Sequence, residues 1–250
     1  MSIYGLTDKG RFRAENQDSF DICVLEQETL AVVCDGMGGA AAGRLASDMA
    51  SARFIAYARA ALDAEGSENI EDILRLAADA ANRAVFQAAC ENPDYDGMGS
   101  TLVAACFQER TASFVNVGDS RAYRISKDGI MQITKDHSLV QQMVDAGQLT
   151  PAQARRHPRR NIITRAIGGE TFVTSDIFTT RARNNDRFLL CSDGLINAVD
   201  EAEVHRLVLA ARDPDTACRN LLAAALERDA RDNITAIVYF AQKGDAQYGE

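Results

Sequence analysis

Short apolar runs alternate with longer segments of helical periodicity along this chain. Runs of five to eight residues rich in β-branched and aromatic side chains predict strands. Nine such runs cover residues 2–7, 19–24, 30–34, 101–107, 112–117, 121–125, 172–178, 187–191 and 233–240. Nine short strands indicate more than one small sheet.

Apolar residues recur every three or four positions in the segments between these strands, which predicts amphipathic helices. The segments cover residues 42–62, 70–88 and 201–212 and the stretch that begins at Asp213. Asp213 in the N-cap position and Pro214 in the first turn mark the start of the last helix. Each segment has one apolar stripe, so each helix is expected to cover the face of a sheet.

The order of these elements predicts an α+β fold, because strands come in hairpin-like runs and helices come in pairs rather than in regular βαβ alternation. Two antiparallel sheets covered by helix pairs fit this order. The 250 residues, 46% of them hydrophobic, suffice for one domain with a full core. Residues 137–170 break the pattern, since they are polar, rich in arginine and poor in periodicity, and they predict an excursion from the core.

Charge and cysteine usage exclude several classes of protein. A net charge of −9 argues against a nucleic-acid-binding protein, because phosphate backbones attract basic surfaces. The six cysteines are scattered without CxxC spacing, which favours buried thiols in a reducing compartment over disulfides. The N-terminus lacks a signal-peptide pattern, and no apolar run approaches the roughly 18 residues of a membrane span. We therefore expect a cytoplasmic protein that binds neither nucleic acid nor membranes.

Four aspartates stand at the ends of predicted strands. Asp35, Asp119 and Asp193 follow apolar runs, and Asp232 precedes one. A single Asp-Gly after a strand is most often a turn, but four aspartates at strand ends favour a shared site. Gathered carboxylates repel one another and require counter-charge. Oxygen ligands without a His or Cys cluster indicate Mg²⁺ or Mn²⁺ rather than zinc.

Glycines follow Asp35 directly, and they allow the backbone to approach closely enough for a main-chain carbonyl to bind a metal. The motif "DGMGG" that contains them is one of eight short motifs spread over nearly the whole chain. They are "RAENQD" (13–18), "DGMGG" (35–39), "GSTLV" (99–103), "GDSRAY" (118–123), "DHSLV" (136–140), "TRAIG" (164–168), "CSDGL" (191–195) and "RDNIT" (231–235). In this order they resemble the bacterial metal-dependent protein phosphatases of type 2C, the PPM family.

That resemblance implies a four-layer α-β-β-α sandwich, with two central antiparallel sheets flanked by helix pairs and a bimetal site at one edge. It implies a single domain over residues 1–250, in which the excursion at about 137–170 is the family's flap subdomain. The run "RRHPRR" (155–160) lies within this excursion. It remains open whether this run is a solvated face or a docking site for an acidic or phosphorylated partner segment.

The same resemblance assigns the metal ligands. Asp35 is implied to bridge two metal ions, and the Gly36 carbonyl to bind one of them. Asp193 and Asp232 are implied to bind the other ion. Asp119 matches the ligand of a third, weaker ion in bacterial members, where Asp193 is a shared ligand.

Other residues match groups that handle the substrate. Arg13 matches the arginine that binds the substrate phosphate, although a surface arginine is the simplest reading of this residue alone. Asp18 matches a carboxylate that hydrogen-bonds metal-bound water, and Asn233 is expected to orient the Asp232 loop. Ala40 stands where many bacterial relatives carry a histidine that is a candidate proton donor. Gln17 replaces a glutamate found in some relatives, and water can serve in both places.

The resemblance implies a Mg²⁺- or Mn²⁺-dependent serine/threonine protein phosphatase with two tightly bound ions and a weaker third. Water activated by the two metals attacks the phosphorus, so no protein nucleophile is needed. The implied partners are phosphorylated proteins and a cognate bacterial Ser/Thr kinase, and the implied state is a monomer. A phosphatase for an anti-sigma-antagonist-like protein is an alternative within the same chemistry. A pseudophosphatase that binds a phosphoprotein without turnover is the alternative from another class.

Overall fold

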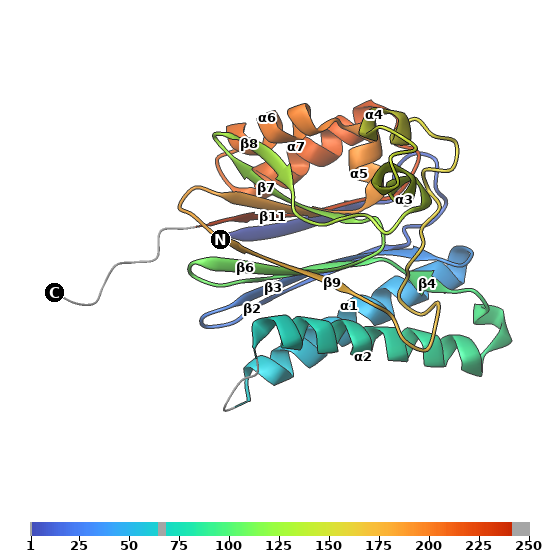
Figure 1. Ribbon diagram of the computed structural model, residues 1–250. Coiled ribbons are helices and arrows are strands. Elements are labelled where there is room, and N and C mark those ends of the chain that lie inside the picture. The colour runs from blue at the N-terminus through green and yellow to red at the C-terminus, as the bar shows by residue number, and fades with distance from the viewer. Residues whose placement is uncertain (1, 65–68, 242–250) are drawn as a thin grey trace.

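Two antiparallel sheets lie face to face between two layers of helices in the computed structural model, which describes residues 2–64 and 69–241 (Figure 1). The first sheet consists of β1 (Ile3–Asp8), β7 (Arg121–Ser126), β8 (Gly129–Gln132), β10 (Arg187–Cys191) and β11 (Ile234–Phe240). The second sheet consists of β2 (Asp18–Val24), β3 (Thr29–Met37), β4 (Gly99–Ser100), β5 (Leu102–Phe107), β6 (Thr111–Val117) and β9 (Asp176–Arg181). The predicted α+β fold and four-layer sandwich are confirmed.

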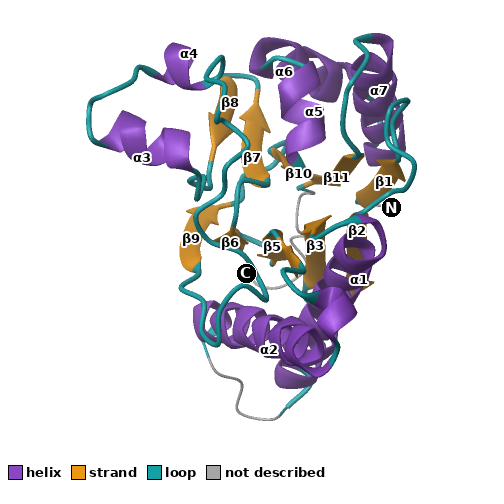
Figure 2. Ribbon diagram, turned by 90° about the vertical axis from the view of Figure 1, so that its right-hand side faces the viewer, coloured by secondary structure: helices purple, strands orange, loops and turns teal. Residues whose placement is uncertain are grey.

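The helices fall into three groups. α1 (Ala40–Leu62) and α2 (Ile70–Glu91) cover the outer face of the second sheet, and η1 (Pro93–Tyr95) follows them. The first sheet is covered by α5 (Asp193–Ala198), α6 (Glu201–Ala210) and α7 (Pro214–Glu227). α3 (Leu139–Asp145) and α4 (Pro151–Ala154) lie to one side of the sandwich (Figure 2). None of the helices in the described part of the chain has the length and apolar character needed to cross a lipid bilayer.

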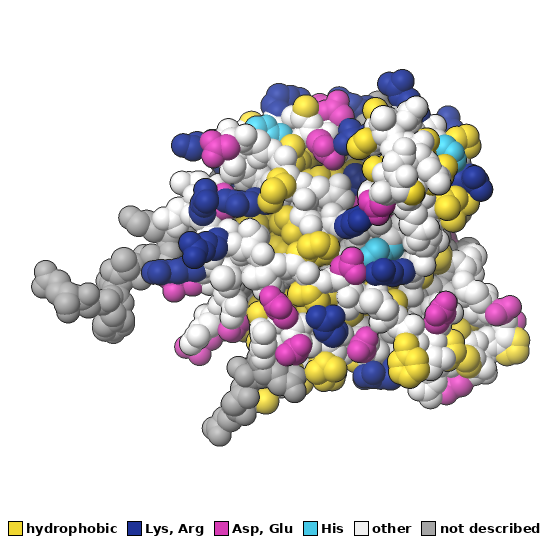
Figure 3. All heavy atoms as spheres, in the orientation of Figure 1, with side chains coloured by type: hydrophobic (Ala, Val, Ile, Leu, Met, Phe, Trp, Pro, Cys, Tyr) yellow, Lys and Arg dark blue, Asp and Glu magenta, His cyan; other side chains and the backbone are white. Residues whose placement is uncertain are grey.

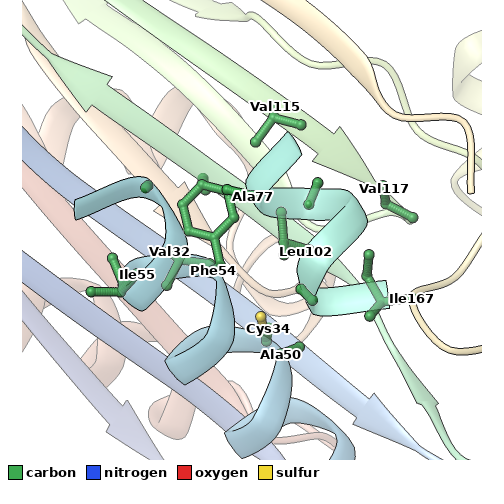
Figure 4. Packing of buried hydrophobic residues seen from close by; sticks show 14 of the residues in the cluster. Val32, Cys34, Ala50, Phe54, Ile55, Ala77, Leu102, Val115, Val117 and Ile167 are labelled. Carbon is green, nitrogen blue, oxygen red and sulfur yellow. The ribbon is translucent and has the colours of Figure 1, made fainter. Parts of the chain in front are cut away.

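The central strands explain why their sequences are apolar without alternation. In β3, Leu30, Val32 and Cys34 pack with the helices α1 and α2, and Figure 4 shows this cluster. Ala31 and Val33 of the same strand face the first sheet. Because successive side chains of a strand point to opposite faces, a strand buried on both sides needs a continuous apolar run.

Aromatic rings fill the space between the two sheets. Phe107 of β5 stacks on Tyr239 of β11, with ring centroids 4.1 Å apart and planes 4° from parallel. Phe114 and Phe188 contact the same cluster from β6 and β10. Such pairs add attraction to the burial of their area, so this layer fixes how the two sheets sit on each other.

One predicted strand is misplaced. The run 172–178 predicted a strand, but β9 begins only at Asp176, and residues 169–175 form a loop. Asn82 in α2 holds this loop by donating to the carbonyls of Glu170 and Thr171, and Phe172 is 82% exposed. The periodicity missed β8, α3, α4 and α5, because these elements are short and half-exposed.

All six cysteines are free thiols, as the sequence predicted. Those at positions 34, 106, 191 and 218 are buried. Cys23 is half-buried and Cys90 is exposed.

Candidate functional site

The four strand-end aspartates meet at one end of the sandwich. Asp35 lies near the end of β3, and Asp119 lies in the turn between β6 and β7. Asp193 follows β10 and Asp232 precedes β11, which pair antiparallel, so these two residues emerge side by side. All four line one pocket of about 490 Å³ together with Arg13. The structure therefore brings together residues that are far apart in the sequence.

Thr101 holds the backbone of Asp35 in place. Its Oγ1 accepts a hydrogen bond from the Asp35 N–H at 2.9 Å, and its own N–H donates to the Asp35 carbonyl at 2.8 Å. The same hydroxyl is 2.7 Å from Ser120 Oγ, next to Asp119. Thr101 was in the motif "GSTLV", but its role depends on a contact across strands that the sequence does not reveal.

Gly36 is a position of very close backbone approach. A Cβ at this residue would lie 2.0 Å from the Gly43 carbonyl oxygen and 2.8 Å from that of Gln17. The Gly36 N–H donates to the Gln17 carbonyl at 3.1 Å. Only glycine therefore lets the start of α1 pack against the end of β3. The side chain of Ala40, at which α1 begins, lies outside what the structure describes.

Asp18 lies behind the pocket and joins the two sheets. It belongs to β2 and pairs with Asp35 in the strand register. Its Oδ2 accepts hydrogen bonds from Ser192 Oγ at 2.7 Å and Thr235 Oγ1 at 2.6 Å, both in or next to the first sheet. Its Oδ1 is buried and has no hydrogen-bond partner among the described residues.

Asn233 organises the loop that carries Arg13. Its Nδ2 donates to the carbonyls of Lys9 and Glu15, both at 2.9 Å, and its Oδ1 accepts from the Gln17 N–H at 2.9 Å. Its own N–H donates to Asp232 Oδ1. One side chain thus fixes the positions of the Asp232 loop and the loop around Arg13 relative to each other.

His137 performs a similar task for the turn before Asp119. The side chain is 6% exposed, and its Nδ1 accepts from the Gly118 N–H at 3.1 Å. Its backbone N–H donates to the Gly118 carbonyl, and Nε2 lies 3.2 Å from Asp176 Oδ2. Burial lowers the pKa of His137 below its ordinary value. A neutral ring is required here, because a protonated Nδ1 cannot accept the Gly118 hydrogen bond.

The carboxylates of the pocket carry more negative charge than their surroundings balance. Burial, followed by repulsion from Asp18 and other neighbouring carboxylates, raises the pKa of Asp35 well above its ordinary value. The same two causes raise the pKa of Asp119 to about 8. They also raise the pKa of Asp193 to about 6. Such a cluster is stable in ionised form only with cations next to it.

Arg13 supplies one such cation in this structure. Its Nη2 donates to Asp232 Oδ2 at 2.7 Å, while Asp193 Oδ2 accepts from Asn197 at 3.0 Å. In the described part of the chain, no three His, Cys, Asp or Glu residues are grouped closely enough to hold a metal ion as they stand.

The donor set nevertheless fits hard divalent cations. It consists of oxygen atoms only, and both Asp18 Oδ1 and Asp193 Oδ1 are buried without a hydrogen-bond partner in the described chain. Buried oxygens without partners are costly unless an ion or water reaches them. Mg²⁺ and Mn²⁺ prefer carboxylate and carbonyl oxygens.

The unfolding free energy of the metal-free protein is expected to fall as pH rises from about 5 to 8. The folded-state pKa of Asp18, raised by burial to about 7, exceeds the value of about 3.9 for an unfolded chain. The same holds for Asp119 and Asp193. Between the two values the folded protein binds more protons, so stability is lost as they dissociate. Thermal unfolding in EDTA across this range measures the effect.

Two controls accompany this measurement. Asp18→Asn removes one of the raised groups and should make the pH dependence shallower. Added Mn²⁺ should raise Tm more at pH 8 than at pH 6, because it binds the ionised carboxylates. A Tm that stays constant or rises with pH in EDTA would contradict the raised pKa values of these carboxyl groups.

Comparison with known proteins agrees with the family resemblance of the sequence motifs. The family model described as protein phosphatase 2C matches residues 11–227. A serine/threonine phosphatase stp of Listeria innocua is 35% identical over 233 residues, which are 93% of this chain and 92% of that protein. A crystal structure of a bacterial serine phosphatase is 36% identical and superimposes with a TM-score of 0.89, covering 98% of this chain and 100% of the other.

One of the similar solved structures contains metal ions. The crystal structure of the catalytic domain of the serine/threonine protein phosphatase PstP in complex with two manganese ions is 33% identical, with a TM-score of 0.81. The match covers 94% of this chain and 96% of that one. The family predicted from the eight sequence motifs is confirmed, and the chain belongs to the protein phosphatase 2C family of bacterial PPM-type serine/threonine protein phosphatases, which are enzymes.

Proposed function

We propose that this chain hydrolyses phosphoserine and phosphothreonine in proteins, using two tightly bound Mn²⁺ or Mg²⁺ ions, and that it opposes a bacterial Ser/Thr kinase. The observation that carries the proposal is the pocket itself. It places Asp35, Asp193 and Asp232 together with Arg13, which is a phosphate-binding type of side chain. Phosphoryl transfer needs cations around the phosphoryl oxygens, and the carboxylates that line this pocket are suitable ligands for divalent cations.

The proposed ligands divide between the two sheets. Asp35 and the Gly36 carbonyl come from β3, whereas Asp193 and Asp232 stand at the ends of β10 and β11. When bound, divalent ions lower the pKa of water and neutralise charge on phosphoryl oxygens. Asp119 is the proposed ligand of a weaker third ion.

The chain's own residues have separate tasks. Arg13 leaves Asp232 and donates to the phosphate of the substrate, for which a guanidinium fork is well shaped. Asp18 uses its free Oδ1 to accept a hydrogen bond from water, while Ser192 and Thr235 hold its other oxygen. Thr101 holds the backbone of Asp35, and the Asn233 N–H holds the side chain of Asp232.

We also propose a single domain over residues 1–250 with a flap at about 137–170, acting as a monomer in the cytoplasm. The position of α3 and α4 beside the sandwich supports the flap (Figure 2). Six free cysteines support a reducing compartment.

Hydrolysis of a phosphoserine peptide with Mn²⁺, Mg²⁺ or EDTA tests the function directly. Phosphate release with either metal and none in EDTA is the expected result. A peptide that binds in calorimetry without any phosphate release would establish the pseudophosphatase instead.

Arg13→Ala is expected to raise KM for phosphopeptide by about tenfold with a smaller change in kcat, because the lost contact to phosphate exists in the ground and transition states alike. Steady-state kinetics on one peptide measures the split. Arg11→Ala is the matched control, since Arg11 is on the same loop but pairs with Asp229. Unchanged kinetics in the Arg13 variant would show that this residue is an ordinary surface arginine without a role in phosphate binding.

Asp119→Ala is expected to lower turnover of phosphopeptides and to move the metal-activation midpoint to higher concentration, because it removes the ligand of the weaker ion. Calorimetry should still detect the two tighter ions. Mg²⁺-like ions keep most of their waters, so one or two carboxylates suffice for weak binding. If Asp119 only shapes the turn, the variant would lose thermal stability but keep its kcat and its activation midpoint.

A further inference from the structure

A second pocket of about 740 Å³ opens beside the carboxylate site. It lies between the segment containing α3 and α4 and the helices α5 and α6. The two pockets share Asp119, Asn161 and Asp193 in their walls, so they adjoin each other. If the phosphoserine of a substrate binds in the first pocket, the substrate residues that flank it can therefore reach the second pocket.

The lining of this second pocket is partly apolar. Side chains from α3, α4 and α5 contribute to it, and they are Val140, Val144, Pro151, Ala154 and Ile196. Several of its charged groups are already in ion pairs. Arg121 donates to Asp136 at 2.7 Å, and Arg155 lies 3.0 Å from Glu201.

Two arginines in the wall differ from these. Arg156 and Arg160 line the pocket, are exposed, and have no ion pair or side-chain hydrogen bond within the described part of the chain. On the face drawn in Figure 3, basic and acidic side chains are interspersed. These two guanidinium groups are therefore available to pair with an anion that enters the pocket.

The wall of the pocket thus carries charges of both signs. Asp119 and Asp193 are shared with the first pocket and favour cations, whereas Arg156 and Arg160 line only the second pocket and favour an anion. A phosphoprotein with a second acidic group near its phosphoserine matches this pattern. Resting on the proposed function, we propose that this pocket binds the segment flanking the phosphoserine and selects substrates with an acidic or phosphorylated side chain there.

The test compares two phosphoserine peptides that differ only in flanking residues, which are glutamates in one and alanines in the other. With Mn²⁺ present, the wild-type protein should have a kcat/KM about tenfold higher for the glutamate peptide, mainly through KM, since charge-assisted pairs with Arg strengthen binding. The double variant Arg156→Glu/Arg160→Glu should abolish or reverse this preference. p-Nitrophenyl phosphate, which has no flanking residues, should be hydrolysed as before.

A matched control separates a specific site from general charge. Arg159 belongs to the same basic run but is not in the pocket wall, and Arg53 is exposed on α1 in the opposite helix layer. Arg53→Glu/Arg159→Glu changes the net charge by the same amount and should keep the preference. Equal loss of preference in both double variants would overturn the pocket and leave only long-range electrostatics.

Other outcomes are equally decisive. Equal kcat/KM for both peptides in the wild-type protein, or a preference that survives Arg156→Glu/Arg160→Glu, would overturn the proposed selection. If no peptide is hydrolysed in Mn²⁺, the proposed function fails, and calorimetric binding of the same two peptides then decides the pocket. Thermal unfolding of each variant checks that the fold is intact.

Discussion

Asp35→Asn is expected to reduce kcat for phosphopeptide at least about 100-fold, equivalent to about 2.7 kcal/mol of barrier. If Asp35 is the anion shared by the two proposed ions, a neutral amide in its place would bind them more weakly and would leave them to repel each other. The comparison is made at saturating Mn²⁺ on one phosphopeptide. A variant that kept more than about a tenth of the wild-type kcat would contradict the bimetal assignment.

Stability separates this loss from unfolding. Burial and repulsion by neighbouring carboxylates raise the pKa of Asp35. An uncharged side chain of the same shape avoids both costs in the metal-free protein. The backbone bonds to Thr101 do not involve the carboxylate and remain. We therefore expect the Asn variant in EDTA at pH 8 to unfold at a temperature equal to or above that of the wild-type protein. A large fall in Tm would mean that the carboxylate has a structural role instead.

Gly36→Ala is a substitution expected to damage the fold strongly. The added Cβ would lie 2.0 Å from the Gly43 carbonyl oxygen and 2.8 Å from the Gln17 carbonyl oxygen. Both are backbone atoms, which cannot rotate away as a side chain can. Separating the start of α1 from β3 is expected to cost about 3 kcal/mol. For a domain of this size that corresponds to a fall in Tm of about 6–12 °C, measured by thermal unfolding in EDTA.

The matched control is Gly169→Ala. A Cβ at Gly169 would meet its nearest neighbour, the Ala166 carbonyl oxygen, at 3.8 Å, which is ordinary contact. This control should leave Tm nearly unchanged. The Gly36 variant should also bind Mn²⁺ more weakly, because its carbonyl is a proposed ligand and the shift moves it. A Tm and metal affinity like those of the wild-type protein would show that the two backbones separate at little cost.

The sequence predicted the sandwich because its central strands are buried on both faces. A short apolar run such as 30–34 fits a strand buried on both faces, and helices with one apolar stripe fit a layer that covers a sheet. Elements with one weakly buried side leave no such pattern. β8, with four residues, and α4, with four, are held by their neighbours rather than by periodicity.

The site was predictable to the extent that it lies at strand ends. Asp193 and Asp232 flank two apolar runs, and an antiparallel pairing of those runs brings them together. The supporting contacts were not predictable. Thr101 and Ser192 act through hydrogen bonds between segments far apart in the chain, and so does Arg13, which pairs with Asp232.

The placement of Asp18 against Ser192 and Thr235 has a consequence for how the protein acquires metal. The proposed ligands belong to two different sheets, and this one buried carboxylate is where the sheets join at that end. A nascent or unfolded chain has no preformed site, so it cannot compete effectively for a scarce divalent ion. If these residues hold the metals as proposed, metal capture would follow closure of the two sheets, and a molecule whose sheets have not closed would be inactive rather than partly active.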